Sequence, residues 1–403
     1  MEWKNYNDFL FGQYGKPKFN DSLNLIMYDL DGTVIQPKGK VRPGAPYNKW
    51  EFVKGAKAHI QKDAQASNTL LVFVTNQLNL PRYADDFRKK IDEIMQELAK
   101  KINFSALFYA ASGRSACRKP STGIFSEHLL PLLKEKGVKN ISRILYVGDA
   151  AGRAGDFNDT DRKYLYNLNL LLNSKLNPLD YGKIALFKTP EEYFQGKKVQ
   201  AFKWGGINPK KIMDEVLKGK KPSELDTLLD DYFGDEEQEI ILMVGLPASG
   251  KSTIAKRIAK DYGYKRVNQD EMKTKAKVYK AIRTYLRQGK SVVVDNTNLD
   301  PARRDEIIKI AQEHFANTER PVKIRAFYIN GDWPLEKQIA FAKHLNTVRQ
   351  RLDGPYINEL VYRVMLKKFE PPTEAEGFTE IINIPFLPRF KNAEHVLAFL
   401  QRS

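Results

Sequence analysis

The stretch Glu239-Ile-Ile-Leu-Met-Val-Gly-Leu-Pro-Ala-Ser-Gly-Lys-Ser252 decides the fold of the second half of the chain. Its run of five apolar residues predicts a buried strand, and the pattern G-x-x-x-x-G-K-[ST] after that run predicts a loop whose N–H groups surround a phosphate. The segment Thr253-Ile-Ala-Lys-Arg-Ile-Ala predicts an amphipathic helix directly after the loop. A strand, a phosphate-binding loop and a helix in this order are typical of a parallel α/β sheet, and an ordinary glycine-rich turn lacks this setting.

The residues of this loop predict ATP and Mg²⁺ as ligands. Backbone N–H groups between Gly245 and Gly250, with those of the helix that Thr253 helps to begin, are expected to cradle the phosphates. Lys251 is expected to reach the β- and γ-phosphate oxygens, and the Ser252 hydroxyl to bind Mg²⁺. We therefore expect this half of the chain to transfer a phosphoryl group from ATP to a hydroxyl.

Such a transfer also needs a base for the attacking hydroxyl and cations for the developing charge. Asp270 is the best candidate for the base, although an aspartate that caps the helix predicted over Glu271–Gln288 explains it almost as well. Asp295 is a candidate metal residue acting through water, and the Asn-Thr-Asn after it is equally consistent with turn chemistry. Cationic candidates, for which a solvated basic helix face is an equal alternative, are the lid arginines Arg349 and Arg351, together with Arg303, Arg304 and Lys273.

The rest of this half continues the α/β pattern. Further strands are predicted at Ser291–Val294 and Ile324–Ile329, and further helices at Asp300–Phe315 and Leu335–Leu352. We assign residues 239–403 to one domain with a phosphate-binding loop. A basic, glycine-bearing segment and an acidic run precede it, and we place a linker over residues 219–238.

The first half of the chain also alternates apolar runs with amphipathic segments, which predicts a second parallel sheet wrapped by helices over residues 1–218. The predicted strands are Leu23–Tyr28, Leu70–Thr75, Leu107–Ala110 and Ile144–Gly148. No internal repeat connects the two halves.

Two carboxylates follow the first of these strands in Tyr28-Asp29-Leu-Asp31-Gly-Thr33. Open α/β sheets bind ligands outside the carboxyl ends of their strands, so Asp29 and Asp31 lie where chemistry is expected. Two acids this close do not titrate alike: one can attack phosphorus while the other protonates the leaving oxygen and then activates water. An ordinary turn after a strand is the alternative for this motif.

Three later features favour chemistry over a turn: Thr75-Asn76 after the next strand, Lys119, and Asp149 at another strand end. This set resembles the haloacid dehalogenase superfamily. The resemblance implies that Asp29 forms an aspartyl-phosphate and that Asp31 is the general acid/base. It further implies a phosphate site at Thr75, Asn76 and Lys119, and a Mg²⁺ shell of Asp29, Asp31 through its carbonyl, and Asp149. Asp161 is our preferred further acid among Asp156, Asp159 and Asp161, for which a helix cap is the alternative.

Composition narrows the class of protein. The 403 residues suggest two domains, and 66 Lys and Arg against 49 Asp and Glu give a formal charge of +17, which attracts polyanions such as nucleic acid. Ribosome-associated and membrane-surface proteins share such a balance. Cys117 is the one cysteine, which excludes a disulfide framework within the chain and favours a reducing compartment. No run approaches the roughly 20 apolar residues of a membrane span, and residues 1–20 lack the pattern of a secretory signal.

Both sites in this order, with several longer segments, resemble one family, the eukaryotic polynucleotide kinase 3′-phosphatases. The segments are Tyr146-Val-Gly-Asp-Ala-Ala-Gly-Arg153, Thr189-Pro-Glu-Glu-Tyr-Phe194, Phe202-Lys-Trp204, Asp295-Asn-Thr-Asn298 and Phe369–Phe378. The resemblance implies removal of 3′-phosphates and ATP-dependent phosphorylation of 5′-hydroxyls at DNA ends, in strand-break repair in the nucleus.

The resemblance also sets expectations about partners. It implies DNA ends as substrate, with RNA as an alternative, a monomer, no membrane, and Asp270 as the base for the 5′-hydroxyl. About twenty residues precede the first strand, so we do not expect the forkhead-associated domain through which animal members bind phosphoprotein scaffolds. A fusion of a kinase and a phosphatase for small molecules is the main alternative, and a nucleic-acid-binding scaffold without turnover is a third.

Overall fold

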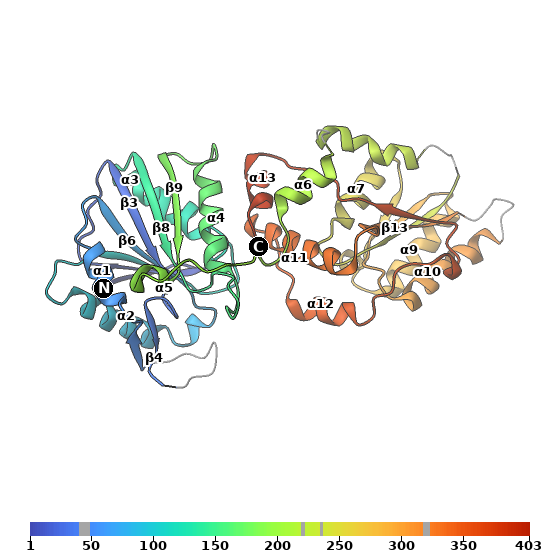
Figure 1. Cartoon of the computed structure of the whole chain (residues 1–403). Coiled ribbons are helices and arrows are strands. Elements are labelled where there is room, and N and C mark those ends of the chain that lie inside the picture. The colour runs from blue at the N-terminus through green and yellow to red at the C-terminus, as the bar shows by residue number, and fades with distance from the viewer. Residues whose placement is uncertain (40–48, 219–221, 234–236, 317–322) are drawn as a thin grey trace. The chain divides into compact units, whose positions relative to one another are not determined.

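The computed structural model describes residues 1–39, 49–218, 222–233, 237–316 and 323–403. Its contacts divide the chain into two compact units (Figure 1). Unit 1 consists of Met1–Gly206, Val348–Gly354 and Phe390–Ser403, and unit 2 consists of Ile207–Thr347 and Pro355–Arg389. Within the described residues, no helix is both long and apolar enough to cross a membrane.

Unit 1 is built on a seven-stranded sheet in the order β1-β2-β7-β6-β3-β8-β9. The five strands from β7 to β9 are parallel, and the antiparallel pair β1–β2 extends the sheet beside β7. The strands span Glu2–Asn5 (β1), Phe9–Tyr14 (β2), Ser22–Tyr28 (β3), Thr69–Asn76 (β6), Ala106–Ala111 (β7), Asn140–Val147 (β8) and Asp180–Lys188 (β9). β4 (Ile35–Pro37) and β5 (Trp50–Phe52) form a separate two-stranded antiparallel sheet.

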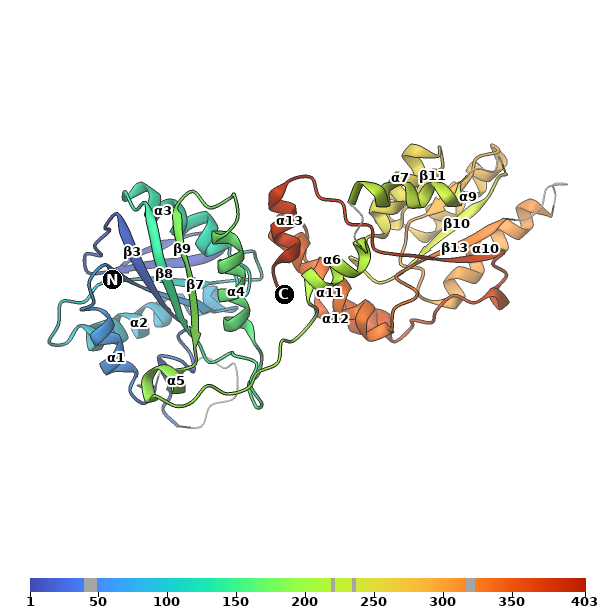
Figure 2. The same cartoon turned by 45° about the horizontal axis from the view of Figure 1, so that its top comes forward.

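Helices cover both faces of this sheet (Figure 2). Alternate residues of β3 show why: Leu25 and Met27 pack in one apolar cluster, with residues of α3 and α4, while Ile26 and Tyr28 pack in the other, with residues of α1, α2 and α5. The helices span Ala56–Asp63 (α1), Ala84–Ala99 (α2), Leu130–Glu135 (α3), Thr160–Leu172 (α4) and Pro190–Gln195 (α5). Short 3₁₀ and π segments lie at Leu80–Arg82 and Ile124–Leu129.

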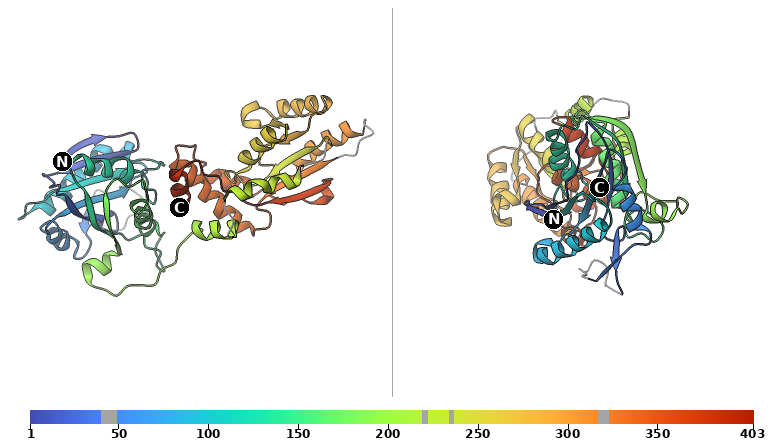
Figure 3. Two further views of the ribbon diagram at one scale, coloured as in Figure 1. Left: turned by 90° about the horizontal axis from the view of Figure 1, so that it is seen from above. Right: turned by 90° about the vertical axis from the view of Figure 1, so that its left-hand side faces the viewer.

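Unit 2 contains a five-stranded, fully parallel sheet in the order β11-β12-β10-β13-β14, with helices on both sides (Figure 3). The strands span Ile240–Val244 (β10), Lys265–Val267 (β11), Val292–Val294 (β12), Ile324–Ile329 (β13) and Glu380–Ile384 (β14). The helices span Pro209–Leu217 (α6), Lys251–Asp261 (α7), Gln269–Met272 (α8), Lys275–Arg287 (α9), Pro301–Phe315 (α10), Leu335–Arg351 (α11) and Glu359–Leu366 (α12). 3₁₀ segments lie at Pro222–Tyr232 and Glu374–Glu376. Every residue of β10 is buried, as its unbroken apolar run predicts.

The α/β class predicted for both halves is confirmed, but the predicted domain limits of 1–218 and 239–403 differ from this division. Helix α6 belongs to unit 2, and α13 (Ala393–Leu400) belongs to unit 1, where Leu397 packs against the apolar cluster of α3 and α4. In the predicted linker, residues 219–221 and 234–236 lie outside the described residues. Leu229, between them, is buried in the cluster that contains Ile254 of α7.

The helix predicted over Glu271–Gln288 is wrong in one respect, because two helices, α8 and α9, occupy this range. Lys273 between them has φ 71°, outside the helical region, and the Thr274 side chain caps α9 by accepting a hydrogen bond from the Lys277 N–H. Among the described residues, seven strands were not predicted: β1, β2, β4, β5, β9, β11 and β14. Six of these seven, all except β2, pair with only one neighbour, so their apolar patterns are weaker.

Candidate active sites

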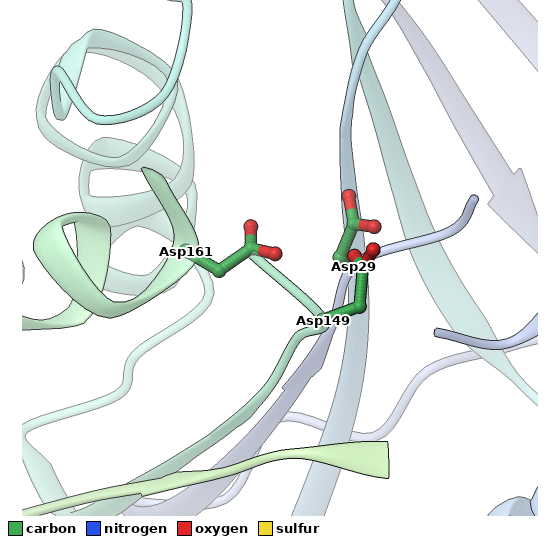
Figure 4. Close-up of side chains that lie close together, drawn as sticks. All are labelled: Asp29, Asp149 and Asp161. Atoms are coloured by element: carbon green, nitrogen blue, oxygen red, sulfur yellow. The ribbon is translucent and has the colours of Figure 1, made fainter. Parts of the chain in front are cut away.

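Three aspartates meet at the carboxyl edge of the unit 1 sheet. Asp29 follows β3, Asp149 follows β8, and Asp161 lies in the first turn of α4. Each offers a carboxylate oxygen, and these oxygens all lie within 4.8 Å of one another (Figure 4). Parallel strands β3 and β8 are neighbours, so the residues after them reach the same place although they are 120 positions apart.

Lys119 lies among these carboxylates. Its Nζ donates to Asp29 Oδ1 at 2.6 Å, to Asp161 Oδ1 at 2.7 Å and to the Tyr146 hydroxyl at 2.8 Å. The backbone of Lys119 is fixed as well, because its N–H donates to Asn76 Oδ1 and its carbonyl accepts from Asn76 Nδ2, both at 3.0 Å. Lys119 therefore lies with two of the acids, and Asn76 fixes its backbone.

Two glycines allow the carboxylates to approach so closely. A Cβ at Gly32, where φ is 82°, would lie 2.5 Å from Asp149 Oδ2, and a Cβ at Gly148 would lie 2.5 Å from Asp161 Oδ2. The buried Thr33 fixes Asp149 further, since its Oγ1 accepts from the Asp149 N–H at 3.0 Å and lies 3.3 Å from Asp149 Oδ1. The Gly-Thr after the two acids thus holds the site together and is more than a turn.

Burial dominates the electrostatics of this cluster. It raises the pKa of Asp29 well above its ordinary value, against the lowering effect of Lys119 and with a further rise from Asp161 and Asp149. It likewise raises the pKa of Asp149 to about 6, with Asp161 adding to the shift. Burial opposes the charge of Lys119, but the carboxylates of Asp161 and Asp29 outweigh it and raise the lysine's pKa. A cluster of three acids and one lysine is short of positive charge.

This donor set fits Mg²⁺. Magnesium binds oxygen ligands and prefers carboxylates, and three acids against one lysine leave negative charge that a divalent cation would neutralise. Asp29 and Asp149 would hold the ion through carboxylate oxygens, and Asp161 is the third acid of the group. The geometry thus agrees with the choice of Asp161 as the further acid.

The two other aspartates that were considered with Asp161 contact groups outside the cluster. Asp156 forms an ion pair with Arg153 at 3.0 Å and accepts from the Ala151 N–H, while Asp159 pairs with Lys163 at 2.9 Å and accepts from the Gly205 N–H. These contacts fix the backbone after Asp149, so we assign structural roles to both.

The carboxylate of Asp31 is not one of the three clustered carboxylates and accepts a hydrogen bond from Gln77, a residue that was not predicted. Gln77 Nε2 donates to Asp31 Oδ2 at 2.6 Å and to Thr75 Oγ1 at 3.0 Å, and its Oε1 accepts from the Tyr83 hydroxyl at 3.0 Å. Gln77 directly follows the end of β6, where strand alternation no longer applies, so no local pattern marked it.

Asp29, Asp31, Thr75 and Lys119 all line one cavity of about 690 Å³ in unit 1. Its wall also contains Lys90 of α2 and Arg118, and Phe157 lies at its rim with 98% of its surface exposed. An almost fully exposed phenylalanine and two cations around one cavity suit a ligand that carries both a ring and negative charge. The exposure of Phe157 depends on tertiary structure and has no signal in the sequence.

The phosphate-binding loop of unit 2 joins β10 to α7, as predicted. Gly250 is the N-cap of α7, and Thr253 lies in the first turn. Lys251 is buried, and its Nζ donates to the Leu246 carbonyl at 2.6 Å. The Ser252 hydroxyl donates to Asp295 Oδ1 at 3.0 Å, so the two predicted metal residues of this unit lie together.

Asp295 is held by two neighbours. Its Oδ2 accepts from Arg266 Nε at 2.8 Å, and its carbonyl accepts from Asn268 Nδ2 at 2.6 Å. Arg266 also pairs with Glu271 at 2.8 Å. Sequence analysis missed Arg266, because an arginine in a three-residue strand has no distinctive pattern.

Asp270 is exposed at the beginning of α8, where the Asn268 side chain accepts hydrogen bonds from the Asp270 and Glu271 N–H groups. The helix cap is therefore Asn268, which removes the main alternative for Asp270. The side chain of Arg303 donates to Gln269 Oε1, so this cation lies next to the proposed base, and Lys273 is exposed directly after α8. Arg304 is instead fully buried and pairs with Glu376 at 2.6 Å, which is a structural role.

The predicted lid arginines, Arg349 and Arg351, belong to unit 1, whereas the loop belongs to unit 2. The guanidinium of Arg351 donates to Ser121 Oγ and to the carbonyls of Ala398, Gln401 and Arg402. These contacts argue against the predicted ATP-binding role of Arg351, because every nitrogen of its guanidinium is already engaged. Arg349 remains a candidate.

Comparison with known families agrees with two separate sites. A family model described as polynucleotide kinase 3 phosphatase matches residues 24–176, and one described as an AAA domain matches residues 240–372. The first range contains the aspartate cluster, and the second contains the phosphate-binding loop.

Curated relatives match nearly the whole chain. The bifunctional polynucleotide phosphatase/kinase of Schizosaccharomyces pombe is 32% identical over 395 residues, which cover 96% of this chain and 85% of that protein. A relative in Acanthamoeba polyphaga mimivirus, whose name describes the same two activities, is 28% identical over 419 residues and covers 96% of this chain and 90% of its own length. The polynucleotide 3′-phosphatase of Saccharomyces mikatae is 27% identical over 228 residues, 43% of this chain and 86% of that protein.

Proposed function

Because the chain belongs to the family of bifunctional polynucleotide phosphatase/kinases, we propose that it repairs the ends of broken DNA strands in the nucleus. Unit 1 removes 3′-phosphates, and unit 2 transfers the γ-phosphate of ATP to 5′-hydroxyls. The observation that carries this proposal is that one basic chain contains two phosphoryl-transfer sites, one suited to removing a phosphate and one suited to adding it. The protein then prepares both kinds of end that joining requires.

In unit 1, the Asp29 carboxylate attacks the phosphorus of the 3′-phosphate and forms an aspartyl-phosphate. Lys119 holds Asp29 in place and balances charge on the phosphate oxygens, which Thr75 also contacts. Asp31, oriented by Gln77, protonates the leaving 3′-oxygen and then removes a proton from the water that cleaves the intermediate. Mg²⁺, held by Asp29 and Asp149, would supply positive charge against the transferring phosphoryl group.

The rim of the cavity supports a polynucleotide as substrate of this site. Phe157 offers an exposed ring on which the terminal base can stack, and Lys90 and Arg118 offer charge for the phosphate that links the last two nucleotides. The formal charge of +17 adds attraction for a polyanion of any sequence.

In unit 2, the N–H groups of the Gly245–Ser252 loop and Lys251 bind the phosphates of ATP. Ser252 and Asp295 would hold Mg²⁺, since their oxygens already lie 3.0 Å apart. Asp270 accepts the proton of the attacking 5′-hydroxyl, and its exposure leaves it open to a strand end. The candidates for contact with the substrate phosphates are Arg303, which is bonded to Gln269 of α8, and Lys273, directly after α8.

One oligonucleotide with a 5′-hydroxyl and a 3′-phosphate tests both activities together. Incubation with radiolabelled ATP and Mg²⁺ should add a 5′-phosphate and release the 3′-phosphate, and the products separate on a gel. Asp29→Ala should retain labelling and lose release, while Lys251→Ala should do the opposite.

Parallel reactions with RNA, with a 3′-mononucleotide and with sugar phosphates define the substrate class. Similar rates on the small molecules and on the oligonucleotide would favour a metabolic fusion enzyme and contradict strand repair. Failure to label any 5′-hydroxyl end would refute the kinase half.

A further inference from the structure

Arg351 is the last residue of α11, and its half-buried side chain contacts other residues of unit 1. Nε donates to Ser121 Oγ at 3.0 Å, and the two terminal nitrogens donate to three backbone carbonyls. These carbonyls belong to Ala398, Gln401 and Arg402, at distances of 2.7–2.9 Å. One guanidinium thus joins residues from three distant parts of the sequence.

All four acceptors are uncharged oxygens, so no carboxylate is among these hydrogen-bond partners of the half-buried cation. Desolvation lowers the pKa of Arg351 to about 9, in line with partners that carry no formal charge. The three carbonyls lie at the end of α13, where the helix dipole is negative and the last carbonyls lack partners within the helix. The helix end therefore compensates for part of the cost of burying the charge.

The Ser121 side of this arrangement is a loop of the phosphatase site. We call Lys119–Thr122 the Lys119 loop. Each residue after Lys119 is tied to the same surroundings: the Pro120 carbonyl accepts from Asn167 Nδ2 at 2.8 Å, Ser121 accepts from Arg351, and Thr122 Oγ1 accepts from Gln401 Nε2 at 3.0 Å.

Asn167 closes the network. Its Nδ2 also donates to the Arg402 carbonyl at 2.8 Å, and its Oδ1 accepts from the Arg402 N–H at 2.7 Å. Asn167 lies on α4, the helix that carries Asp161. The residues around Arg402 are thereby bonded both to the Lys119 loop and to the helix of the third acid.

We propose that Arg351, together with residues 398–402, positions the Lys119 loop for removal of 3′-phosphates and has no part in the use of ATP. Lys119 Nζ must meet Asp29 and Asp161 at 2.6 Å and 2.7 Å, and the loop behind it has three of its four residues fixed by this network. Arg351 is thus a positioning residue of the first site, although its place in the sequence is between segments of the second unit. This inference rests on the proposed phosphatase function of unit 1.

Arg351→Met separates the positioning role from the ATP-binding lid role. The first predicts loss of phosphatase activity, and the second predicts loss of kinase activity. If Arg351 positions the Lys119 loop, the kcat for 3′-phosphate release should fall roughly 10- to 100-fold with KM little changed, since small misplacements of catalytic groups cost this much. Labelling of 5′-hydroxyls by ATP should stay at the wild-type rate. Loss of labelling with intact phosphate release would overturn the inference and restore the lid role.

Lys391→Met is the matched control, because it removes an exposed cation from the segment of unit 1 that contains residues 398–402. Both of its activities should equal those of the wild type. The wild type itself separates this inference from the proposed function: if it releases no 3′-phosphate from any oligonucleotide, the proposed function fails before Arg351 is tested.

A double-mutant cycle distinguishes positioning from a general loss of stability. Ser121→Ala should lower the phosphatase kcat in the wild-type background. In the Arg351→Met background it should have almost no further effect, because Arg351→Met already removes the hydrogen bond between these two residues. Additive effects on kcat would overturn the inference. Gln401→Leu covers the case in which Arg351→Met does not fold, since it breaks only the bond to Thr122 and should lower the phosphatase kcat alone.

Discussion

The two sites of the chain hold their charged groups in opposite ways. In unit 1 the lysine and the acids contact one another directly and are buried, whereas in unit 2 Asp270 is exposed and Lys251 donates to a carbonyl of its own loop. The protein therefore fixes the phosphatase geometry in advance, and the kinase geometry depends more on what the ligands contribute. Changes at Lys119 should therefore affect stability and activity together, and changes at Asp270 should affect activity alone.

Lys119→Met tests the first half of this comparison and should have the largest effect. Removal of one partner of a buried ion pair leaves unpaired charge, so the free energy of unfolding should fall by about 3–5 kcal/mol. The phosphatase kcat should fall by roughly 10³-fold or more, because a cation that opposes the transition-state charge is lost. Thermal unfolding and phosphate release measure the two effects. Loss of activity without loss of stability would break the comparison.

Asp270→Asn tests the second half. Kinase kcat should fall roughly 10²- to 10⁴-fold, the usual contribution of a general base, with stability within about 0.5 kcal/mol of the wild type because the side chain is exposed. Glu313→Gln, at another exposed acid of unit 2, is the control and should change neither quantity. A marked drop in melting temperature in Asp270→Asn would show that this site is also held by internal contacts.

Phe157→Ala tests whether the exposed ring in unit 1 contacts the substrate. Loss of a stacking ring should raise KM for an oligonucleotide 3′-phosphate about tenfold, in the range of 1–3 kcal/mol per stacked base, and leave kcat unchanged. A sugar phosphate, which has no base, should show no change in KM. An equal rise for both substrates would mean that Phe157 shapes the cavity and does not stack on a base.

Much of the fold and of both sites could be predicted because their signals are local. Asp29, Thr75 and Asp149 follow apolar runs, and parallel strands bring the residues after them to one edge of the sheet. The phosphate-binding loop carries its strand, pattern and helix within one short segment. The family assignment, made from these motifs and the longer segments, is confirmed by relatives that match nearly the whole chain.

The remaining parts depend on contacts that no local pattern encodes. Arg351 and Ser121 are 230 positions apart, and Gln401 and Thr122 are 279 apart, so the support of the Lys119 loop was invisible in the sequence. Arg351 has the residue type and helical setting expected of a lid arginine, and only its hydrogen bonds to Ser121 and to residues 398–402 show the difference. A charged residue on a helix predicts an exposed face, and the exceptions depend on tertiary packing.

The smallest expected effect is the rise in melting temperature that Mg²⁺ causes without ATP, and this rise should depend on pH. Burial raises the pKa of Asp149 to about 6, above its value in the unfolded chain. In the absence of metal, this acid contributes stability below its unfolded pKa, and that contribution is lost as the pH rises through about 6. Above that pH the carboxylate is charged and can bind a cation, so Mg²⁺ should raise the melting temperature by a few degrees at pH 7.5, from a stabilisation of about 2.7 kcal/mol at 100 times Kd, and much less at pH 5. Asp149→Asn should remove this difference between the two pH values, and a variant that still responds to Mg²⁺ like the wild type would show that the ion binds elsewhere.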